Sequence, residues 1–202
     1  MTSTDAGHAL VAQQLDAGIA AWARFAEQMA QPELRGAVEA AGQVVLDALR
    51  GGHTLLVAGN GGSASVAGHV ATEFLGKCIL DRRPLPAISL AESSSTLTAV
   101  GNDYGFDQVF VRGVKAHGQP GDVLLAMSTS GTSPNVIAAL AEARSRGLTT
   151  IFMVGMKGAG QGHLTDHLLV VPSAETPRIQ EVHLLWSHAW CEAIDLAMQE
   201  HS

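Results

Sequence analysis

The stretch TLLVAGNGGSASVAGHVATEFL, residues 54–75, decides the fold class of this chain. It begins with a short apolar run, Thr54–Ala58, which lacks polar alternation and is typical of a strand buried on both faces. A glycine-rich loop follows, and an apolar pattern at helical spacing then covers Ser63–Leu75. The stretch therefore predicts a strand, a tight loop and a helix in direct succession, which is the building unit of a parallel α/β sheet.

The same unit recurs along the rest of the chain. Short runs rich in Val, Ile and Leu predict further buried strands at Pro86–Leu90, Val123–Met127, Thr150–Val154 and His167–Val171. Helical patterns cover Asp107–His117, Pro134–Arg146 and Pro177–Gln199. Alternating strands and helices predict a doubly wound α/β fold, with a five-stranded parallel sheet flanked by helices.

The first 50 residues are expected to form a helical N-terminal extension. Apolar residues recur at helical spacing over Leu10–Met29 and Leu34–Leu49, Pro32 separates the two stretches, and the glycine pair at 51–52 ends them. We find no linker, internal repeat or low-complexity segment. Residues 1–202 are therefore predicted to form one domain.

Composition excludes several classes of protein. The 202 residues contain 12 Lys and Arg against 19 Asp and Glu, a net charge of −7 without any basic run, so no nucleic-acid partner is expected. The apolar runs fall far short of the roughly 20 residues that span a bilayer, and the N-terminus lacks the basic region of a signal peptide. Only two cysteines occur, Cys78 and Cys191, which favours a reducing compartment. We therefore expect a cytoplasmic protein without a membrane partner.

The glycine-rich loop after the first strand is one candidate binding site. Gly59, Gly61 and Gly62 let the backbone approach a ligand, and Ser63 is expected to cap the following helix. A loose dinucleotide-binding pattern also begins at Gly59, but it requires an acidic residue about 20 positions further on. The nearest candidate, Glu92, lies 33 positions after Gly59. A tight turn that binds no ligand is the other alternative.

A hydroxyl-rich loop, Ser128–Pro134, is the second candidate binding site. Pro134 suits the first position of a helix, where its missing N–H costs nothing. Four or five hydroxyl groups gather at this helix N-terminus, whose free amides and positive dipole end favour an anion. Capping alone would need only one of them. Two such loops at strand ends of one sheet predict a pocket for a phosphorylated polyhydroxyl compound.

Two helices carry candidate metal ligands. His69 and Glu73 are four residues apart and share a helix face, an arrangement found in metal half-sites and also in plain surface pairs. On the C-terminal helix, Gln180 and His188 lie about 80° apart around the axis, and His183 lies about 140° from His188. Spacing alone leaves open which of the two histidines belongs to a site.

Five motifs occur in order along essentially the whole chain: Gly59-Asn60-Gly61-Gly62-Ser63, His69-x-x-x-Glu73, Gly101-Asn102-Asp103-Tyr104-Gly105, the run Gly121–Gly131, and Arg178-Ile179-Gln180-Glu181-Val182-His183. In this combination the sequence closely resembles the phosphoheptose isomerases. These are sugar isomerase (SIS) domain enzymes that interconvert sedoheptulose 7-phosphate and D-glycero-D-manno-heptose 7-phosphate. The resemblance implies a single SIS domain with a flavodoxin-like sheet.

The resemblance also implies a set of site residues. One zinc ion per subunit would be bound by His69, Glu73, Gln180 and His188, which favours His188 over His183. Phosphate contacts would come from Ser128, Thr129, Ser130 and Ser133. Further substrate contacts would come from Asn60, Gly61, Gly62, Ser63, Glu73, Asn102, Asp103 and Gln180.

The resemblance to the family also bears on the assembly of the protein and on one position at which the chain departs from the family pattern. Family members are homotetramers with active sites at subunit contacts, and Lys77 stands where many of them place a basic residue that reaches a neighbour's ligand. Pro177 stands where several members have Asp, so one substrate contact is expected to be missing.

Aldose–ketose isomerisation moves a proton between neighbouring carbons through an enediol, so it needs a base at carbon and an acid at oxygen. The hypothesis for this chain is that Glu73 is the base and His188 the acid–base partner at O1 and O2. The alternative is a non-catalytic SIS module that binds a sugar phosphate or a protein such as the bacterial replication initiator. Modules of that group lack the helix glutamate, whereas this chain has Glu73 together with His188.

Overall fold

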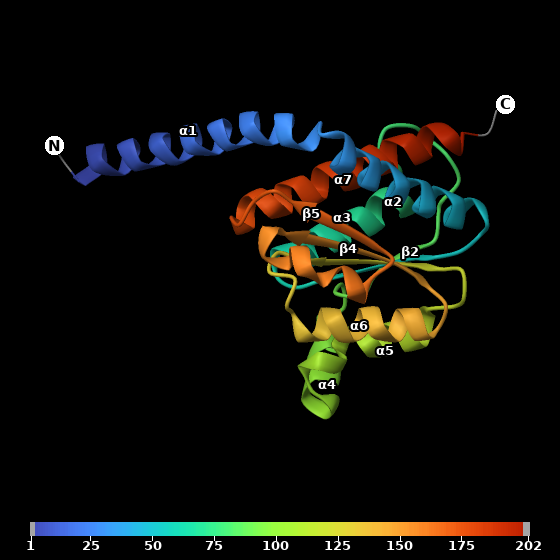
Figure 1. Cartoon of the computed structure of the whole chain (residues 1–202). Helices are drawn as coiled ribbons and strands as arrows, with labels where there is room; N and C mark the ends of the chain where they lie inside the picture. The colour runs from blue at the N-terminus through green and yellow to red at the C-terminus, as the bar shows by residue number, and fades with distance from the viewer. Residues whose placement is uncertain (1–2, 200–202) are drawn as a thin grey trace.

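All five strands expected from the sequence are present in the computed structural model, which describes residues 3–199 (Figure 1). They are β1 (Leu55–Gly59), β2 (Ala87–Ser89), β3 (Val123–Ser128), β4 (Thr149–Gly155) and β5 (His167–Val171). Each end lies within one residue of its predicted position. The strand order is β2-β1-β3-β4-β5 and every pairing is parallel, which confirms the flavodoxin-like sheet. The predicted domain also includes residues 1–2 and 200–202, which lie outside the described part.

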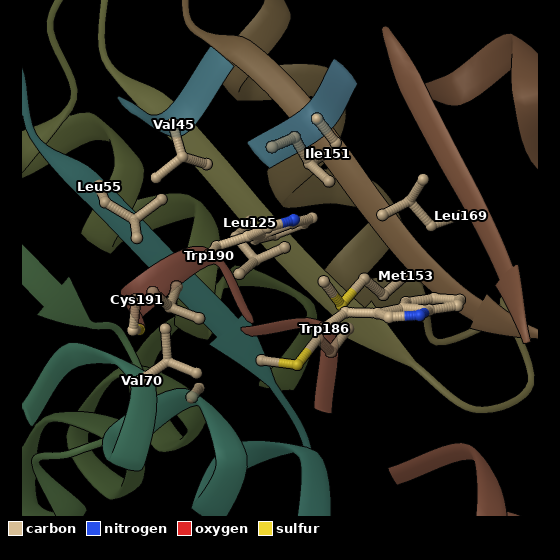
Figure 2. Close-up of a cluster of buried hydrophobic side chains, with 14 of the residues drawn as sticks. Val45, Leu55, Val70, Leu125, Ile151, Met153, Leu169, Trp186, Trp190 and Cys191 are labelled. Carbon is tan, nitrogen blue, oxygen red and sulfur yellow. The ribbon is translucent and has the colours of Figure 1, made fainter. Parts of the chain in front are cut away.

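Helices cover both faces of the sheet. One face carries α2 (Pro32–Arg50), α3 (Gly62–Leu75) and α7 (Thr176–Ala197), while the other carries α5 (Val109–His117) and α6 (Pro134–Ser145). Figure 2 shows the core of the first face, where Val45, Trp186 and Trp190 pack over Leu125 and Met153 of the central strands. Burial of these apolar side chains is the main force that holds the helices to the sheet.

The helical N-terminal segment divides into two parts. Helix α2 belongs to the covering layer, because Ala41, Val45 and Leu49 are fully buried. Helix α1 (Ser3–Met29) packs only through its C-terminal part, where Ala21 and Phe25 are buried, and Figure 1 shows its N-terminal part reaching beyond the sheet. Among the described residues, no helix is both long and apolar enough to cross a bilayer.

Three short elements complete the fold, and the sequence patterns did not predict two of them. Helix α4 (Ser94–Tyr104) buries none of its residues, so it has no apolar face for a pattern to reveal. It begins with a cap, in which the Thr96 N–H donates to Ser93 Oγ at 3.2 Å. The 3₁₀ segment η2 (Met156–Leu164) is rich in glycine and was not predicted either, while η1 (Phe106–Gln108) lies at the start of the stretch expected to be helical from Asp107.

Candidate functional site

The strand order brings the two candidate loops together. In a sheet of this order the chain direction across the sheet reverses between β1 and β3, and ligands bind beyond the carboxyl ends of the strands at that point. The glycine-rich loop follows β1 and the hydroxyl-rich loop follows β3, and the ends of these strands pair directly, with Gly59 opposite Met127. The two loops therefore form the two sides of one pocket.

Six of the twelve predicted substrate-binding residues line this pocket. Asn60 and Ser63 come from the first loop, three hydroxyl side chains come from the second, and Gln180 comes from the first turns of α7. The lining residues are Asn60, Ser63, Met127, Ser128, Thr129, Ser133 and Gln180. Nearly all of the side chains are neutral hydrogen-bonding groups, which suits a polar ligand such as a phosphate ester.

The hydroxyl-rich loop does more than cap its helix. Ser133 occupies the N-cap position of α6, yet its side chain makes no capping hydrogen bond and instead lies 2.9 Å from Ser128 Oγ. Ser130 does not line the pocket but belongs to the same cluster, since its Oγ lies 3.4 Å from Ser128 Oγ and accepts the Thr132 N–H. The hydroxyl groups thus gather at a helix N-terminus that attracts an anion.

The glycine-rich loop differs from the expectation in one respect. Ser63 does not cap α3: the N-cap is Gly61, and Ser63 lies buried inside the first turn. The glycines have the expected role of permitting close approach, because a Cβ at Gly62 would lie 2.5 Å from the Gln180 side-chain amide. Gly61 has φ of +54°, a conformation that favours glycine. The loop therefore lets α7 place Gln180 against the start of α3.

His69 and Glu73 on α3 and His188 on α7 form a second cluster. One donor atom from each of the three lies within 4.8 Å of the others. His69 Nε2 lies 2.9 Å from His188 Nε2 and 3.3 Å from Glu73 Oε1. Ligand atoms bound about 2 Å from a tetrahedral zinc ion lie about 3.3 Å apart, and imidazole and carboxylate are zinc ligands. The cluster therefore fits a divalent metal ion such as zinc.

A partly buried thiol, that of Cys78, lies next to this cluster. Burial, together with the neighbouring Glu73 and Asp195 carboxylates, raises the pKa of Cys78 to about 11. The thiol therefore stays protonated at neutral pH beside the Glu73 carboxylate. Cys78 and Cys191 are both free cysteines.

The cluster and the pocket lie along the same two helices. With a rise of about 1.5 Å per residue, His69 is about 10 Å beyond Gly62 on α3, and His188 is about 12 Å beyond Gln180 on α7. Both helices start at the carboxyl edge of the sheet and pack against each other. A ligand anchored in the pocket can therefore reach the cluster by lying along α3 and α7.

The structure separates the two histidines that spacing left open. His183 is fully buried, and neither of its ring nitrogens has a hydrogen-bond partner among the described residues. Burial lowers its pKa to about 4, and the nearby Val154 backbone opposes this shift only partly. His188 instead joins His69 and Glu73, so His188 is the histidine that can contribute to a site.

Two predicted substrate contacts lie elsewhere on this chain. Asn102 and Asp103 are exposed near the end of α4, where the Asn102 amide donates to the Asp103 carboxylate at 2.8 Å. Helix α4 lies on the opposite side of the sheet from α3 and α7 (Figure 1). Neither residue lines the pocket, so their role stays a prediction. Lys77 and Pro177 are both exposed.

Sequence reasoning missed two features around the site. Asn135, in the first turn of α6, pairs its side-chain amide with that of Asn60 across the pocket. Arg82 forms a buried ion pair with Asp195, with Arg82 Nε 2.8 Å from Asp195 Oδ1. No local signal was available for the Asn135 pairing, since Asn60 lies 75 residues away in the chain. None was available for Arg82 and Asp195, which are 113 residues apart.

Comparison with known proteins agrees with this geometry. The SIS domain family model matches residues 19–155. The chain is 48% identical over 197 residues to a phosphoheptose isomerase of Bradyrhizobium sp. (strain ORS 278), with 98% of each chain covered. It is 52% identical over 154 residues to the phosphoheptose isomerase of Pelobacter propionicus, covering 76% of this chain and 82% of the relative.

Solved structures give the same result. A phosphoheptose isomerase from Neisseria gonorrhoeae superposes with a TM-score of 0.84 at 39% identity, covering 92% of this chain and 99% of that one. One from Francisella tularensis superposes with a TM-score of 0.81 at 34% identity, covering 97% of this chain and all of that one. With identities of 34–52% over most of its length, the chain belongs to the phosphoheptose isomerase family of SIS-domain enzymes.

Proposed function

We propose that this isomerase converts sedoheptulose 7-phosphate to D-glycero-D-manno-heptose 7-phosphate through an enediol. The geometry that carries the proposal is that α3 begins beside the polar pocket and reaches His69 of the His69–Glu73–His188 cluster after an axial rise of about 10 Å. With carbon–carbon bonds of about 1.5 Å, an open chain of seven carbons spans about 8 Å, and its phosphate adds to this length. A linear heptose phosphate is therefore the right length to join the two.

The phosphate end is assigned to the hydroxyl-rich loop. Ser128, Thr129 and Ser133 line the pocket, Ser130 lies beside them, and the N-terminus of α6 adds backbone amides. Hydrogen bonds to a charged group contribute about 1.5–3 kcal/mol each, so several of them hold a phosphate without a local arginine. This agrees with an acidic chain that supplies few cations.

The reacting end is assigned to the cluster. Glu73 removes the proton from the carbon next to the carbonyl and returns it to the neighbouring carbon, while His188 moves a proton between O1 and O2. The carboxylate and the imidazole belong to one cluster, as a two-group proton transfer requires. A module that only binds phosphate has no use for this pair, which favours the isomerase over the binding alternative.

A zinc ion is proposed as the cofactor, held by His69, Glu73 and His188. Gln180, proposed as the fourth ligand, packs against Gly62 at the start of α3 and would have to turn its side-chain amide toward the cluster. Such an ion, when bound, would polarise the substrate oxygens and stabilise the negative charge of the enediolate. The exposed His69 side chain leaves the cluster open to solvent, so that an ion can enter. Metal analysis of the purified protein should give one zinc per subunit, and a chelator should remove both the zinc and the activity.

The assignment of Glu73 and His188 is tested by Glu73→Gln and His188→Ala. Each should lower kcat for sedoheptulose 7-phosphate by about 10²–10⁴-fold, the usual contribution of general acid–base catalysis. Glu39→Gln and His163→Ala alter exposed residues of the same types and should leave kcat unchanged. A near-normal rate in either site variant refutes the role assigned to that residue.

We also propose a homotetramer in the cytoplasm, with active sites at subunit contacts. An apolar stripe on α1, formed by Val11, Leu15 and Ile19, is 61–69% exposed in the single chain. Exposed apolar stripes of this kind mark association surfaces. The free thiols of both cysteines suit a reducing compartment.

A further inference from the structure

The two loops of the pocket are joined by a reciprocal pair of side-chain amides. Asn60 Nδ2 donates to Asn135 Oδ1 at 2.9 Å, and Asn135 Nδ2 donates to Asn60 Oδ1 at 2.9 Å. Asn135 is only 1% exposed, and its Oδ1 also accepts the Val136 N–H at 3.0 Å. These three bonds fix the orientation of the Asn135 amide.

The amide pair lies just beyond the last paired residues of β1 and β3. The parallel pairing of β1 and β3 ends at Gly59 and Met127, and Asn60 is the first residue beyond it. From Asn60 the chain enters α3, which carries His69 and Glu73, while Asn135 lies in the first turn of α6 behind the hydroxyl groups. The amide pair is thus a direct link between the phosphate side and the reacting side of the site.

A shift of either loop would break this link at a cost. A buried donor or acceptor left without a partner costs about 1–3 kcal/mol. Each of the two amides offers one donor and one acceptor to the other, so a shift would leave several such groups without partners. The pair therefore favours one separation of the two loops over neighbouring ones. A substrate that spans both loops requires that separation, because an error of about 1 Å at the reacting atoms can cost about 10²-fold in rate.

We propose that Asn135 is a positioning residue, which acts through Asn60 to set the separation between the phosphate-binding loop and the catalytic cluster. The proposal rests on the proposed function, since that function assigns the two ends of the substrate. It adds that inorganic phosphate, which is assigned to the hydroxyl-rich loop, binds almost independently of the Asn135 side chain. The reaction of the substrate, which contacts both the hydroxyl-rich loop and the catalytic cluster, depends on the amide pair.

The first test compares kcat for sedoheptulose 7-phosphate with the inhibition constant for inorganic phosphate in Asn135→Ala. We expect kcat to fall about 10–100-fold while the inhibition constant changes less than about 3-fold. The Val136 N–H keeps a partner in this variant, because it also donates to the Ser133 carbonyl at 3.1 Å. Ser145→Ala, at the exposed far end of α6, is the matched control and should leave both values unchanged.

The second test is a double-mutant cycle with Asn60→Ala. If Asn135 acts through Asn60, adding Asn135→Ala to Asn60→Ala changes kcat/KM by less than about 2-fold, and if the two act independently the losses multiply. Multiplying losses overturn the proposal, and so does an Asn135→Ala enzyme with normal kcat. A fall in phosphate affinity equal to the fall in kcat/KM also overturns it, because Asn135 would then only build the phosphate loop.

The thermal midpoint of each variant separates positioning from folding. If Asn135→Ala does not fold, Asn135→Ser replaces it, since serine is too short to reach Asn60 but keeps a polar group near the Val136 N–H. The wild-type protein is assayed first. If it binds phosphate but does not isomerise sedoheptulose 7-phosphate, the proposed function is refuted, and the inference about Asn135 is refuted with it. A wild-type protein that is active with both substitutions silent refutes the inference alone.

Discussion

Two histidines on α7, five residues apart, lie in opposite environments. His188 contacts His69 in the candidate metal cluster, while His183 is enclosed in the core without a hydrogen-bond partner among residues 3–199. Burial disfavours the charged imidazolium, which is why the pKa of His183 falls to about 4. One residue type therefore serves as a polar site residue in one place and as a neutral core residue in the other.

This difference predicts how stability depends on pH. An unfolded His183 binds a proton below pH of about 6.5, but the folded one binds it only below about 4, so the unfolding free energy falls as pH drops between these values. At pH 5 the loss from this group amounts to about 2 kcal/mol relative to pH 7. In His183→Leu that component should disappear. Urea unfolding at pH 5 and pH 7 measures it, and an identical pH dependence in variant and wild type would contradict the assignment.

At the residue scale the sequence could predict chemistry but not burial. The spacing of His69 and Glu73 correctly predicted a shared helix face, and the hydroxyl-rich loop correctly predicted a polar pocket. Spacing could not choose between His183 and His188, because the choice depends on which side of α7 meets the sheet. That side is set by packing against strands far away in the chain.

At the scale of elements, the link between α3 and α7 depends on a buried ion pair. The Arg82 guanidinium donates to Asp195 and also to carbonyl groups at the end of α3, including those of Glu73 and Phe74. Asp195 Oδ2, on α7, accepts the N–H groups of residues 78, 79 and 80. Burial by itself would raise the pKa of Asp195, but these donors and the Arg82 charge outweigh it and lower the pKa. The pair thus holds together the two helices that carry the cluster.

We predict that Arg82→Met lowers the unfolding free energy by about 3–5 kcal/mol, because it leaves the Asp195 carboxylate buried without its charge partner. The matched control is Arg35→Met, which removes an ion pair with Glu39 whose side chains are 70% and 62% exposed. That exposed pair should contribute nothing measurable. Denaturant unfolding measures the unfolding free energy of both variants. Equal stability of Arg82→Met and wild type would refute the role of the ion pair.

Elements with a strong apolar pattern could be predicted from the sequence, and elements without one could not. Helices cover the sheet on both faces, so the apolar runs of the five strands mark them to within one residue. Helix α4 has no buried residue and depends on a cap, which a pattern of apolar residues does not detect. The Arg82–Asp195 and Asn60–Asn135 pairs join distant parts of the chain and leave no local signal.

At the scale of the whole molecule, α1 carries an exposed apolar surface that is suited to association with another chain. Val11, Leu15 and Ile19 repeat every four residues and share one face, and all three are more than half exposed. Burial of such a stripe between copies of the chain would supply the association that the proposed tetramer requires.

We predict that Ile19→Arg dissociates the assembly into smaller species, because a buried unpaired charge is strongly unfavourable at an interface. Gln13→Arg places the same charge about 160° around α1 from Leu15 and should leave the assembly intact. Sedimentation equilibrium of the purified proteins gives the masses. A wild-type monomer, or an Ile19→Arg protein with unchanged mass, would contradict the role of α1.

The central claim is that one site holds the phosphate of a seven-carbon sugar and reacts about 10 Å away, at the His69–Glu73–His188 cluster. The most direct test compares kcat/KM for sedoheptulose 7-phosphate with that for fructose 6-phosphate, which is one carbon shorter. We expect the seven-carbon substrate to be favoured by about 100-fold, since the shorter one cannot place its reacting carbons correctly while its phosphate is bound. Equal turnover of the two substrates, or no turnover of sedoheptulose 7-phosphate, would contradict the claim.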